Sequence, residues 1–169
     1  MQDLRYYKVM ADYNRWMNIK LYSVCSDIPD EVRQRDVGGF FKSLHGGLNH
    51  LLVTDRIWLD RFQGRTPTFQ SLDVVVHEDF ASLRQERERV DQEIQEWVNG
   101  LSVDWLKQPF TFESKVDGQS RTLPGWLMAV HLFNHQTHHR GQITALLHQL
   151  GYAYGVTDLP WLPSLQALD

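Results

Sequence analysis

Four long stretches of this chain carry apolar residues at intervals of three and four, the spacing of one face of an α-helix. They span approximately residues 4–24, 43–62, 78–98 and 122–150. In the third stretch the repeating positions are Phe80, Leu83, Arg87, Val90, Ile94 and Trp97. Four such helices joined by a few sizeable connections are typical of a helix bundle. The pattern therefore predicts an all-α protein built as a four-helix bundle.

The ends of the second and last helices carry recognisable signals. Ser43 is a good N-cap residue for the second helix, and Gly151 is suited to end the last one. The last helix is expected to begin at Thr122 or Leu123, with Pro124 in its first turn. These signals give the expected helices definite boundaries.

Residues 110–121 interrupt the helical pattern. Apolar and polar residues alternate in Phe110-Thr111-Phe112, and Asp117-Gly118 suits a tight turn. We expect a short hairpin or an ordered loop inserted before the last helix. The length of 169 residues suits a single domain that spans residues 1–169.

Composition argues against several classes of partner. The formal net charge is −4 and like charges do not form a block, so nucleic acid is not the expected partner. The sequence lacks a run of about 18 apolar residues, so no membrane span is expected. Cys25 is the single cysteine, which excludes an intramolecular disulfide. The N-terminus lacks the apolar core of a signal peptide, and together these features fit a cytoplasmic protein.

Four of the eight histidines lie within nine positions of the last predicted helix. His135 and His139 are one helical turn apart and fall on or beside the centre of the apolar stripe, whereas His131 falls at its edge and His138 is expected to be exposed. Each inward imidazole has two ring nitrogens to satisfy in a low-dielectric interior, and one shared cation would satisfy both rings. The spacing therefore favours a metal ion over a pair of hydrogen-bonded core histidines.

A third protein ligand must come from elsewhere in the chain. The candidates are His45, His50, His77 and His148. His50 lies in the middle of the second predicted helix, from which it can reach a bundle core, while His45 lies near the start of that helix. Periodicity favours His50 only modestly and leaves His45 open.

Several motifs resemble those of the DinB-like (DinB/YfiT-like) family of proposed metalloenzymes. The motifs are Asn134-His135-Gln136-Thr137-His138-His139-Arg140-Gly141-Gln142, Asn49-His50-Leu51-Leu52 with Asp55 and Trp58-Leu59, Tyr13-Asn14-Arg15-Trp16-Met17-Asn18, and Asp158-Leu159. They follow the family order over nearly the whole chain. The resemblance implies an antiparallel four-helix bundle, commonly a homodimer. It also implies one divalent metal ion, nickel or zinc, held by His50, His135 and His139.

Three protein ligands leave room for water or substrate on a metal ion, which is the pattern of a catalytic site. The resemblance implies a metal-dependent enzyme, such as a low-molecular-weight thiol S-transferase or a hydrolase, with a small thiol as cosubstrate. The alternatives are a non-catalytic metal-binding or stress-related binding protein and a purely structural histidine cluster. No catalytic residue is assigned, because Asp55 does not point the same way as His50. Arg140 and Gln142 are candidates for contacts behind the ligands, with Arg140 expected on the polar side of its helix.

Overall fold

The computed structural model describes residues 4–69 and 71–166. These residues are mostly helical and include a two-stranded antiparallel sheet. The expectation of a helical protein is confirmed. The hairpin or loop expected before the last long helix is a paired hairpin, so the fold is mostly helical with a small sheet rather than all-α.

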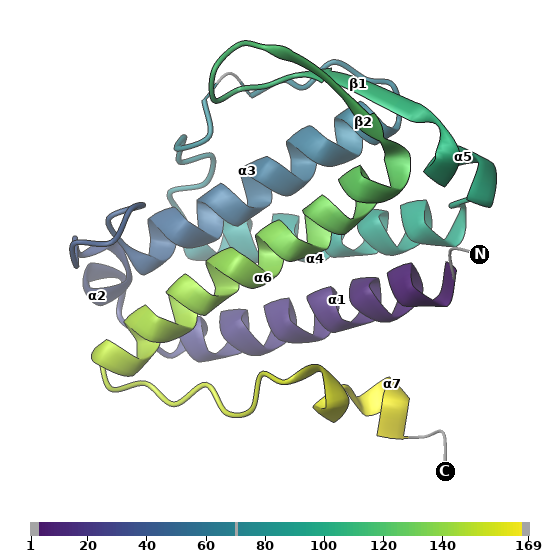
Figure 1. Ribbon diagram of the computed structural model, residues 1–169. Coiled ribbons are helices and arrows are strands. Elements are labelled where there is room, and N and C mark those ends of the chain that lie inside the picture. Colours follow the sequence, from purple (N-terminus) through teal and green to yellow (C-terminus); the bar gives the residue numbers. More distant parts are fainter. Residues whose placement is uncertain (1–3, 70, 167–169) are drawn as a thin grey trace.

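Four long helices make up most of the molecule: α1 (Leu4–Ser26), α3 (Leu44–Phe62), α4 (Phe80–Asn99) and α6 (Gly125–Gln149). Helix α1 packs against α4 and α6, and α3 packs against the same two helices (Figure 1). All four correspond to the stretches predicted from apolar periodicity. Each long helix therefore has two neighbours on which to bury its apolar face.

Side-chain caps fix where two of these helices begin. The Ser43 hydroxyl accepts a hydrogen bond from the Gly46 backbone N–H, so α3 begins where its N-cap was predicted. The Asp79 carboxylate accepts from the Ser82 N–H, and α4 begins at Phe80 rather than at Glu78. Gly151, which follows α6, has a φ of +83°, a left-handed conformation that favours glycine and ends the helix.

The start of α6 differs from the prediction. Thr122 and Leu123 lie in strand β2 (Ser120–Pro124), which pairs with β1 (Pro109–Glu113). The register places Thr122 opposite Thr111, and their hydroxyl oxygens are 2.8 Å apart. Strand pairing therefore supplies hydrogen bonds that a helical turn would have supplied, and Pro124 becomes the N-cap.

Three short helices were not predicted. These are α2 (Asp30–Gln34), α5 (Val103–Lys107) and α7 (Pro163–Gln166), and a 3₁₀ turn, η1, covers Leu159–Trp161. Each has five residues or fewer. Such segments are too short to show a helical period in the sequence.

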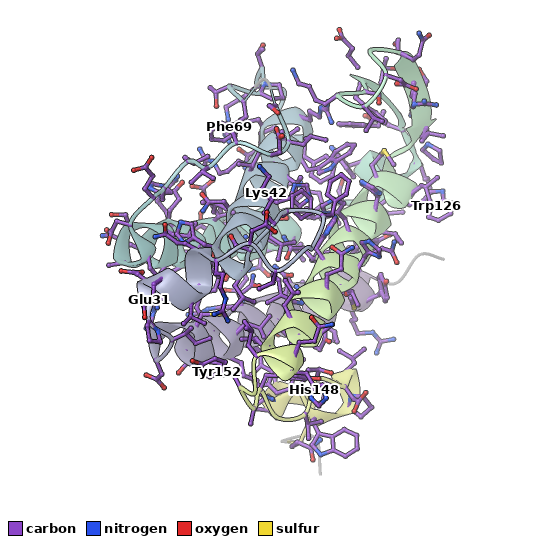
Figure 2. The ribbon with its side chains drawn as sticks, turned by 90° about the vertical axis from the view of Figure 1, so that its left-hand side faces the viewer. Glu31, Lys42, Phe69, Trp126, His148 and Tyr152 are labelled. Carbon is purple, nitrogen blue, oxygen red and sulfur yellow. The ribbon has the colours of Figure 1, made fainter. Side chains whose placement is uncertain are left out.

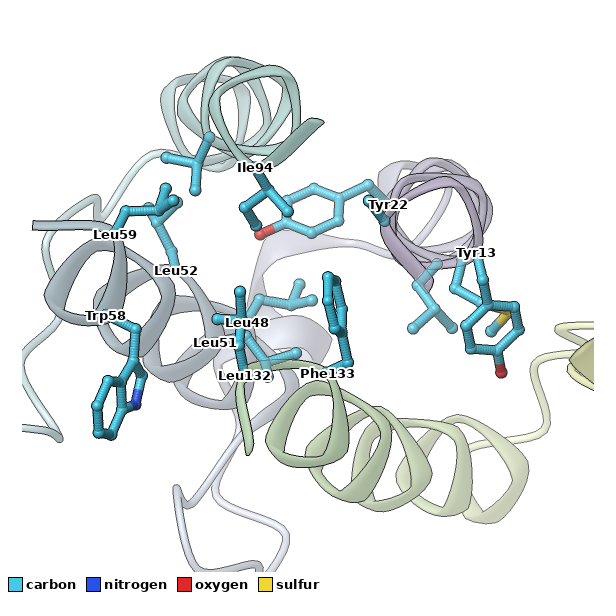
Figure 3. Close-up of a cluster of buried hydrophobic side chains, with 14 of the residues drawn as sticks. Tyr13, Tyr22, Leu48, Leu51, Leu52, Trp58, Leu59, Ile94, Leu132 and Phe133 are labelled. Carbon is cyan, nitrogen blue, oxygen red and sulfur yellow. The ribbon is translucent and has the colours of Figure 1, made fainter. Parts of the chain in front are cut away.

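The main core lies between the long helices. Leu48 and Leu51 from α3 point toward Leu132 and Phe133 from α6, and all four are almost fully buried (Figure 3). Figure 3 shows Trp58 apart from this central group. Removal of this apolar surface from water is the main force that holds the helices together.

An aromatic cluster fastens the hairpin to the end of α3. The Phe62 ring stacks on Trp97 with centroids 4.6 Å apart and meets Phe110 of β1 at 5.4 Å. Trp58 contacts Phe112 of the same strand edge to face at 5.0 Å. Such pairs stabilise beyond their buried area, so β1 is held against α3 although the sheet has only two strands.

The segment after α6 packs along α1 (Figure 1). The Tyr13 hydroxyl donates to the carbonyl oxygen of Thr157 at 2.6 Å, and Leu162 is buried. Cys25 is a buried free thiol, as expected for a lone cysteine. Among the residues that the structure describes, no helix is both long and apolar enough to cross a membrane.

Candidate metal centre

Three histidine rings converge where α3 faces α6. His50 comes from α3, and His135 and His139 come from successive turns of α6. The Nε2 atom of His139 lies 3.2 Å from Nε2 of His50 and 3.1 Å from Nε2 of His135. One potential ligand atom from each ring lies within 4.8 Å of the other two. The structure therefore brings together the three residues that the family resemblance implied.

The two histidines of α6 flank the buried face instead of occupying its centre. They are only partly buried, whereas that face is formed by Met128, Ala129, Leu132, Phe133, Gln136, Arg140, Ile143 and Leu147. The prediction placed both histidines on or beside the centre because it counted Leu146 and Leu150 in the apolar stripe of this helix, and these two leucines are only partly buried. His135 and His139 therefore lie at the rim of the core.

The remaining histidines of the cluster lie as expected. His131 is partly buried at the edge, where its ring meets Trp58 with centroids 4.9 Å apart. His138 is exposed. Figure 2 shows α6 running from Trp126 near one end to His148 near the other, with Lys42 on the loop that precedes α3.

Hydrogen bonds fix the tautomers of two rings. Nδ1 of His50 lies 2.7 Å from the carbonyl oxygen of Leu72, and Nδ1 of His139 lies 2.8 Å from Oε1 of Gln142. A carbonyl oxygen can only accept a hydrogen bond, so each Nδ1 carries the ring proton. In the neutral rings, Nε2 of His50 and Nε2 of His139 consequently present lone pairs to each other.

This arrangement fits a shared cation. Two neutral nitrogens with lone pairs turned toward each other cannot hydrogen-bond, and a metal ion bound to both would satisfy them. Nitrogens bound tetrahedrally to one zinc ion at about 2.0–2.1 Å are roughly 3.3–3.4 Å apart. The observed separations of 3.1 and 3.2 Å are close to that value.

Burial keeps the rings neutral, which is the form that binds metal. Loss of hydration disfavours the charged imidazolium and lowers the pKa of His50 to about 4. The same effect, joined by the charges of His139 and His50, lowers the pKa of His135 to about 3. The pKa of His139 is lowered as well, mainly by burial. All three rings are thus ready to act as ligands at neutral pH.

Phe41 covers one side of the cluster, a role that sequence reasoning missed. Its ring stacks on His50 with centroids 3.8 Å apart and an interplanar angle of 19°, and it meets the His139 ring at 5.4 Å. Phe41 belongs to the loop before α3, in which helical periodicity carries no information. The only signal available was the aromatic pair Phe40-Phe41 in a loop otherwise rich in polar and glycine residues.

The alternative third ligands lie elsewhere. His45 is buried, and its Nε2 is hydrogen-bonded 2.7 Å from the carbonyl oxygen of His77. His77 lies in the loop before α4, and His148 is exposed in the last turn of α6. Of the four candidates, the structure brings only His50 to the pair on α6 within residues 4–69 and 71–166.

Arg140 lies in the core rather than on the polar side of α6. It is 3 % exposed, and its guanidinium donates to Asn14 of α1 and to Gln136. A helical wheel of α6 alone puts Arg140 on the polar side, because the wheel does not include the polar partners on α1 that make the burial of Arg140 possible. Asp55 is likewise buried, and it accepts a hydrogen bond from Arg87 of α4 at 2.8 Å.

A cavity of about 440 Å³ opens beside His135. It lies between α3, the hairpin and the first half of α6, with the side chains of Trp58, Phe112 and Met128 among its walls. This volume is in the range of about 300–1,000 Å³ that is usual for small-molecule sites.

Comparisons with known proteins show the family of this chain and a similar fold. A sequence model described as the DinB family matches residues 1–168. Protein DinB from Bacillus subtilis (strain 168) is 27 % identical in an alignment 162 residues long, and the match covers 88 % of this chain and 88 % of that protein. The crystal structure of a DinB-like protein from Bacillus cereus ATCC 10987 has a similar fold, with a TM-score of 0.64 and 18 % identity, over 83 % of this chain and 89 % of that one.

Proposed function

Because the chain belongs to the DinB family, we propose that its function is to bind one divalent metal ion through Nε2 of His50, His135 and His139. The observation that carries this proposal is the convergence of the three rings, two of which have Nδ1 committed to a carbonyl acceptor. Such outer acceptors are characteristic of metal-ligating histidines, because they fix the tautomer and raise the basicity of the coordinating nitrogen.

We propose nickel or zinc as the ion. Imidazole nitrogens suit both, whereas magnesium and calcium prefer oxygen ligands. In the described part of the chain, the cluster consists of three imidazoles without a carboxylate, and this composition supports the choice.

The proposal extends to a metal-dependent enzyme, with transfer of a low-molecular-weight thiol as the leading reaction and a hydrolase as the second. Three protein ligands leave a position for another ligand, and a cavity adjoins His135. A bound divalent ion would keep a thiol deprotonated or lower the pKa of water. The chain itself contributes ring orientation through Leu72 and Gln142, and Phe41 excludes solvent from one side.

A non-catalytic metal-binding protein is the second candidate. It is favoured by the composition of the cluster, which among the described residues consists of three histidines without a carboxylate. A screen of the metal-loaded protein with bacillithiol, mycothiol and glutathione separates the two. Turnover by the wild type that is lost in the His135→Ala variant supports the enzyme. No turnover with any of the three thiols favours the binding protein.

Other features of the proposal come from chain length, composition and the family resemblance. They are a single domain, an antiparallel four-helix bundle, a homodimer and a cytoplasmic location. The family match over residues 1–168 supports one domain. The pairwise packing of α1, α3, α4 and α6 supports the bundle.

Elemental analysis of purified protein tests the metal proposal. About one divalent ion per chain is expected in the wild type, and His50→Ala should lose it. The matched control is His45→Ala, because both histidines lie on α3 and each is 4 % exposed. Equal metal loss in both variants, or metal-free wild type after incubation with nickel and zinc, would overturn the proposal.

A further inference from the structure

The cavity beside His135 joins two different environments. One end is bordered by His135 itself, and the other by Arg61 near the end of α3. Two ring contacts lead from the Arg61 end to His135. The Trp58 and His131 centroids are 4.9 Å apart, and the His131 and His135 centroids are 5.8 Å apart. A small molecule in this cavity would lie beside the metal centre without displacing any histidine.

The middle of the cavity is apolar and aromatic. Ile57, Leu123 and Met128 line it together with the rings of Trp58 and Phe112. Those two rings meet edge to face at 5.0 Å and are held by their packing. Rigid aromatic walls of this kind bind flat apolar groups with little loss of side-chain freedom.

Arg61 places a cation at the far end of this apolar channel. Its guanidinium carbon lies 4.7 Å from the Trp58 ring centroid and 5.1 Å from that of Phe112. One of its NH₂ groups donates to the carbonyl oxygen of Glu113. Stacking and this hydrogen bond hold the planar group in place, while a guanidinium has five N–H donors in all.

No carboxylate of residues 4–69 and 71–166 forms an ion pair with Arg61, whereas Arg87 and Arg121 are among the arginines that do form ion pairs. Partial burial lowers the pKa of Arg61, because loss of hydration disfavours the cation, and the nearby charge of Glu113 acts in the opposite direction. Lys115 and Arg121 also line the cavity, and the acidic Asp117 is paired with Arg121. Arg61 therefore presents to a ligand a guanidinium that no carboxylate of the described residues ion-pairs.

We infer that this cavity binds a small organic acid with a flat apolar body. Its acidic group pairs with Arg61, its body lies against Trp58 and Phe112, and its other end faces His135. The inference rests on the proposed function and deepens it, because it names the substrate class for the same site. Charge and shape carry it: arginine recognises carboxylates through planar N–H pairs, and the aromatic walls suit an uncharged ring system.

Calorimetric titration with 2-naphthoate, and with neutral 2-naphthamide as its matched analogue, tests the inference. The wild-type protein should bind naphthoate at least tenfold more tightly than naphthamide. Arg61→Gln should abolish this preference and leave the binding of naphthamide within twofold. Arg84→Gln, which changes an arginine outside the cavity on α4, is the control and should alter neither. Equal binding of both probes by the wild type, or an unchanged preference in Arg61→Gln, would overturn the inference.

Metal loading separates this inference from the proposed function. Proton signals of bound naphthoate should be shifted or broadened in protein loaded with paramagnetic Co²⁺, relative to Zn²⁺-loaded protein. Metal uptake without naphthoate binding would refute the acid site alone. Naphthoate binding that depends on Arg61 in protein unable to take up metal would support the acid site and refute the metal proposal. Unaffected proton signals in Co²⁺-loaded protein would refute the placement beside His135.

Discussion

Gln142 offers a test of how the metal centre is held together. Its Oε1 accepts a hydrogen bond from Nδ1 of His139 at 2.8 Å, and that bond keeps the lone pair on Nε2. The variant Gln142→Leu removes the acceptor and leaves His139 itself in place. Metal affinity should fall because the ring gains freedom to rotate and to change tautomer.

The size of the effect follows from the exposure of the side chain. Loss of an acceptor behind a ligating histidine costs about 10- to 100-fold in metal affinity. Gln142 is exposed, so water can replace part of its hydrogen bond. We therefore expect the lower end of this range, a loss of metal affinity of about tenfold, or roughly 1.4 kcal/mol of binding free energy.

Competition with a chromophoric chelator measures this change for Zn²⁺ and Ni²⁺. Gln149→Leu is a suitable control, because it makes the same change at another exposed position of α6. Gln142→Glu keeps an acceptor and should bind metal at least as tightly as the wild type, since a carboxylate raises the basicity of the ring. Wild-type affinity in Gln142→Leu would refute the argument that this hydrogen bond orients His139.

Two further predictions concern the scaffold. Arg87→Met should lower the free energy of unfolding by about 3–5 kcal/mol, because Asp55 and Asp91 lose the buried cation that lies 2.8 and 2.9 Å from them. Urea denaturation measures this free energy, and a loss under about 1 kcal/mol would contradict the pairing. Gly125→Ala should cost about 1–3 kcal/mol, because the new Cβ would lie 2.5 Å from the carbonyl oxygen of Trp105. Calorimetry should show a lower Tm for this variant, and an unchanged Tm would mean that the backbone there adjusts freely.

Most of the helical architecture could be predicted from sequence because apolar periodicity is a local signal. Residues such as Phe80, Leu83 and Val90 repeat at helical spacing and are all buried on α4. The start of α6 could not be predicted in this way. Thr122 and Leu123 follow strand geometry because β1 pairs with them, and pairing is not encoded in their own neighbours.

In the site, too, local sequence patterns indicated some features, and contacts between residues far apart in the sequence determine the others. The spacing of His135 and His139 indicated a shared ion, but periodicity could not choose between His50 and His45, and the family resemblance made that choice. The acceptor for His50 is the backbone of Leu72, 22 positions away in a loop, so no side-chain pattern indicates it. Burial of Arg140 depends in the same way on Asn14 of α1.

The most direct test of the central claim is a long-range ¹H–¹⁵N spectrum of the histidine rings, recorded before and after addition of one equivalent of Zn²⁺. The account predicts that His50 and His139 keep a protonated Nδ1, and that the Nε2 signals of His50, His135 and His139 all move to metal-bound positions while those of His45 and His138 stay in place. Coordination through Nδ1, or unchanged Nε2 signals in the three rings, would contradict it.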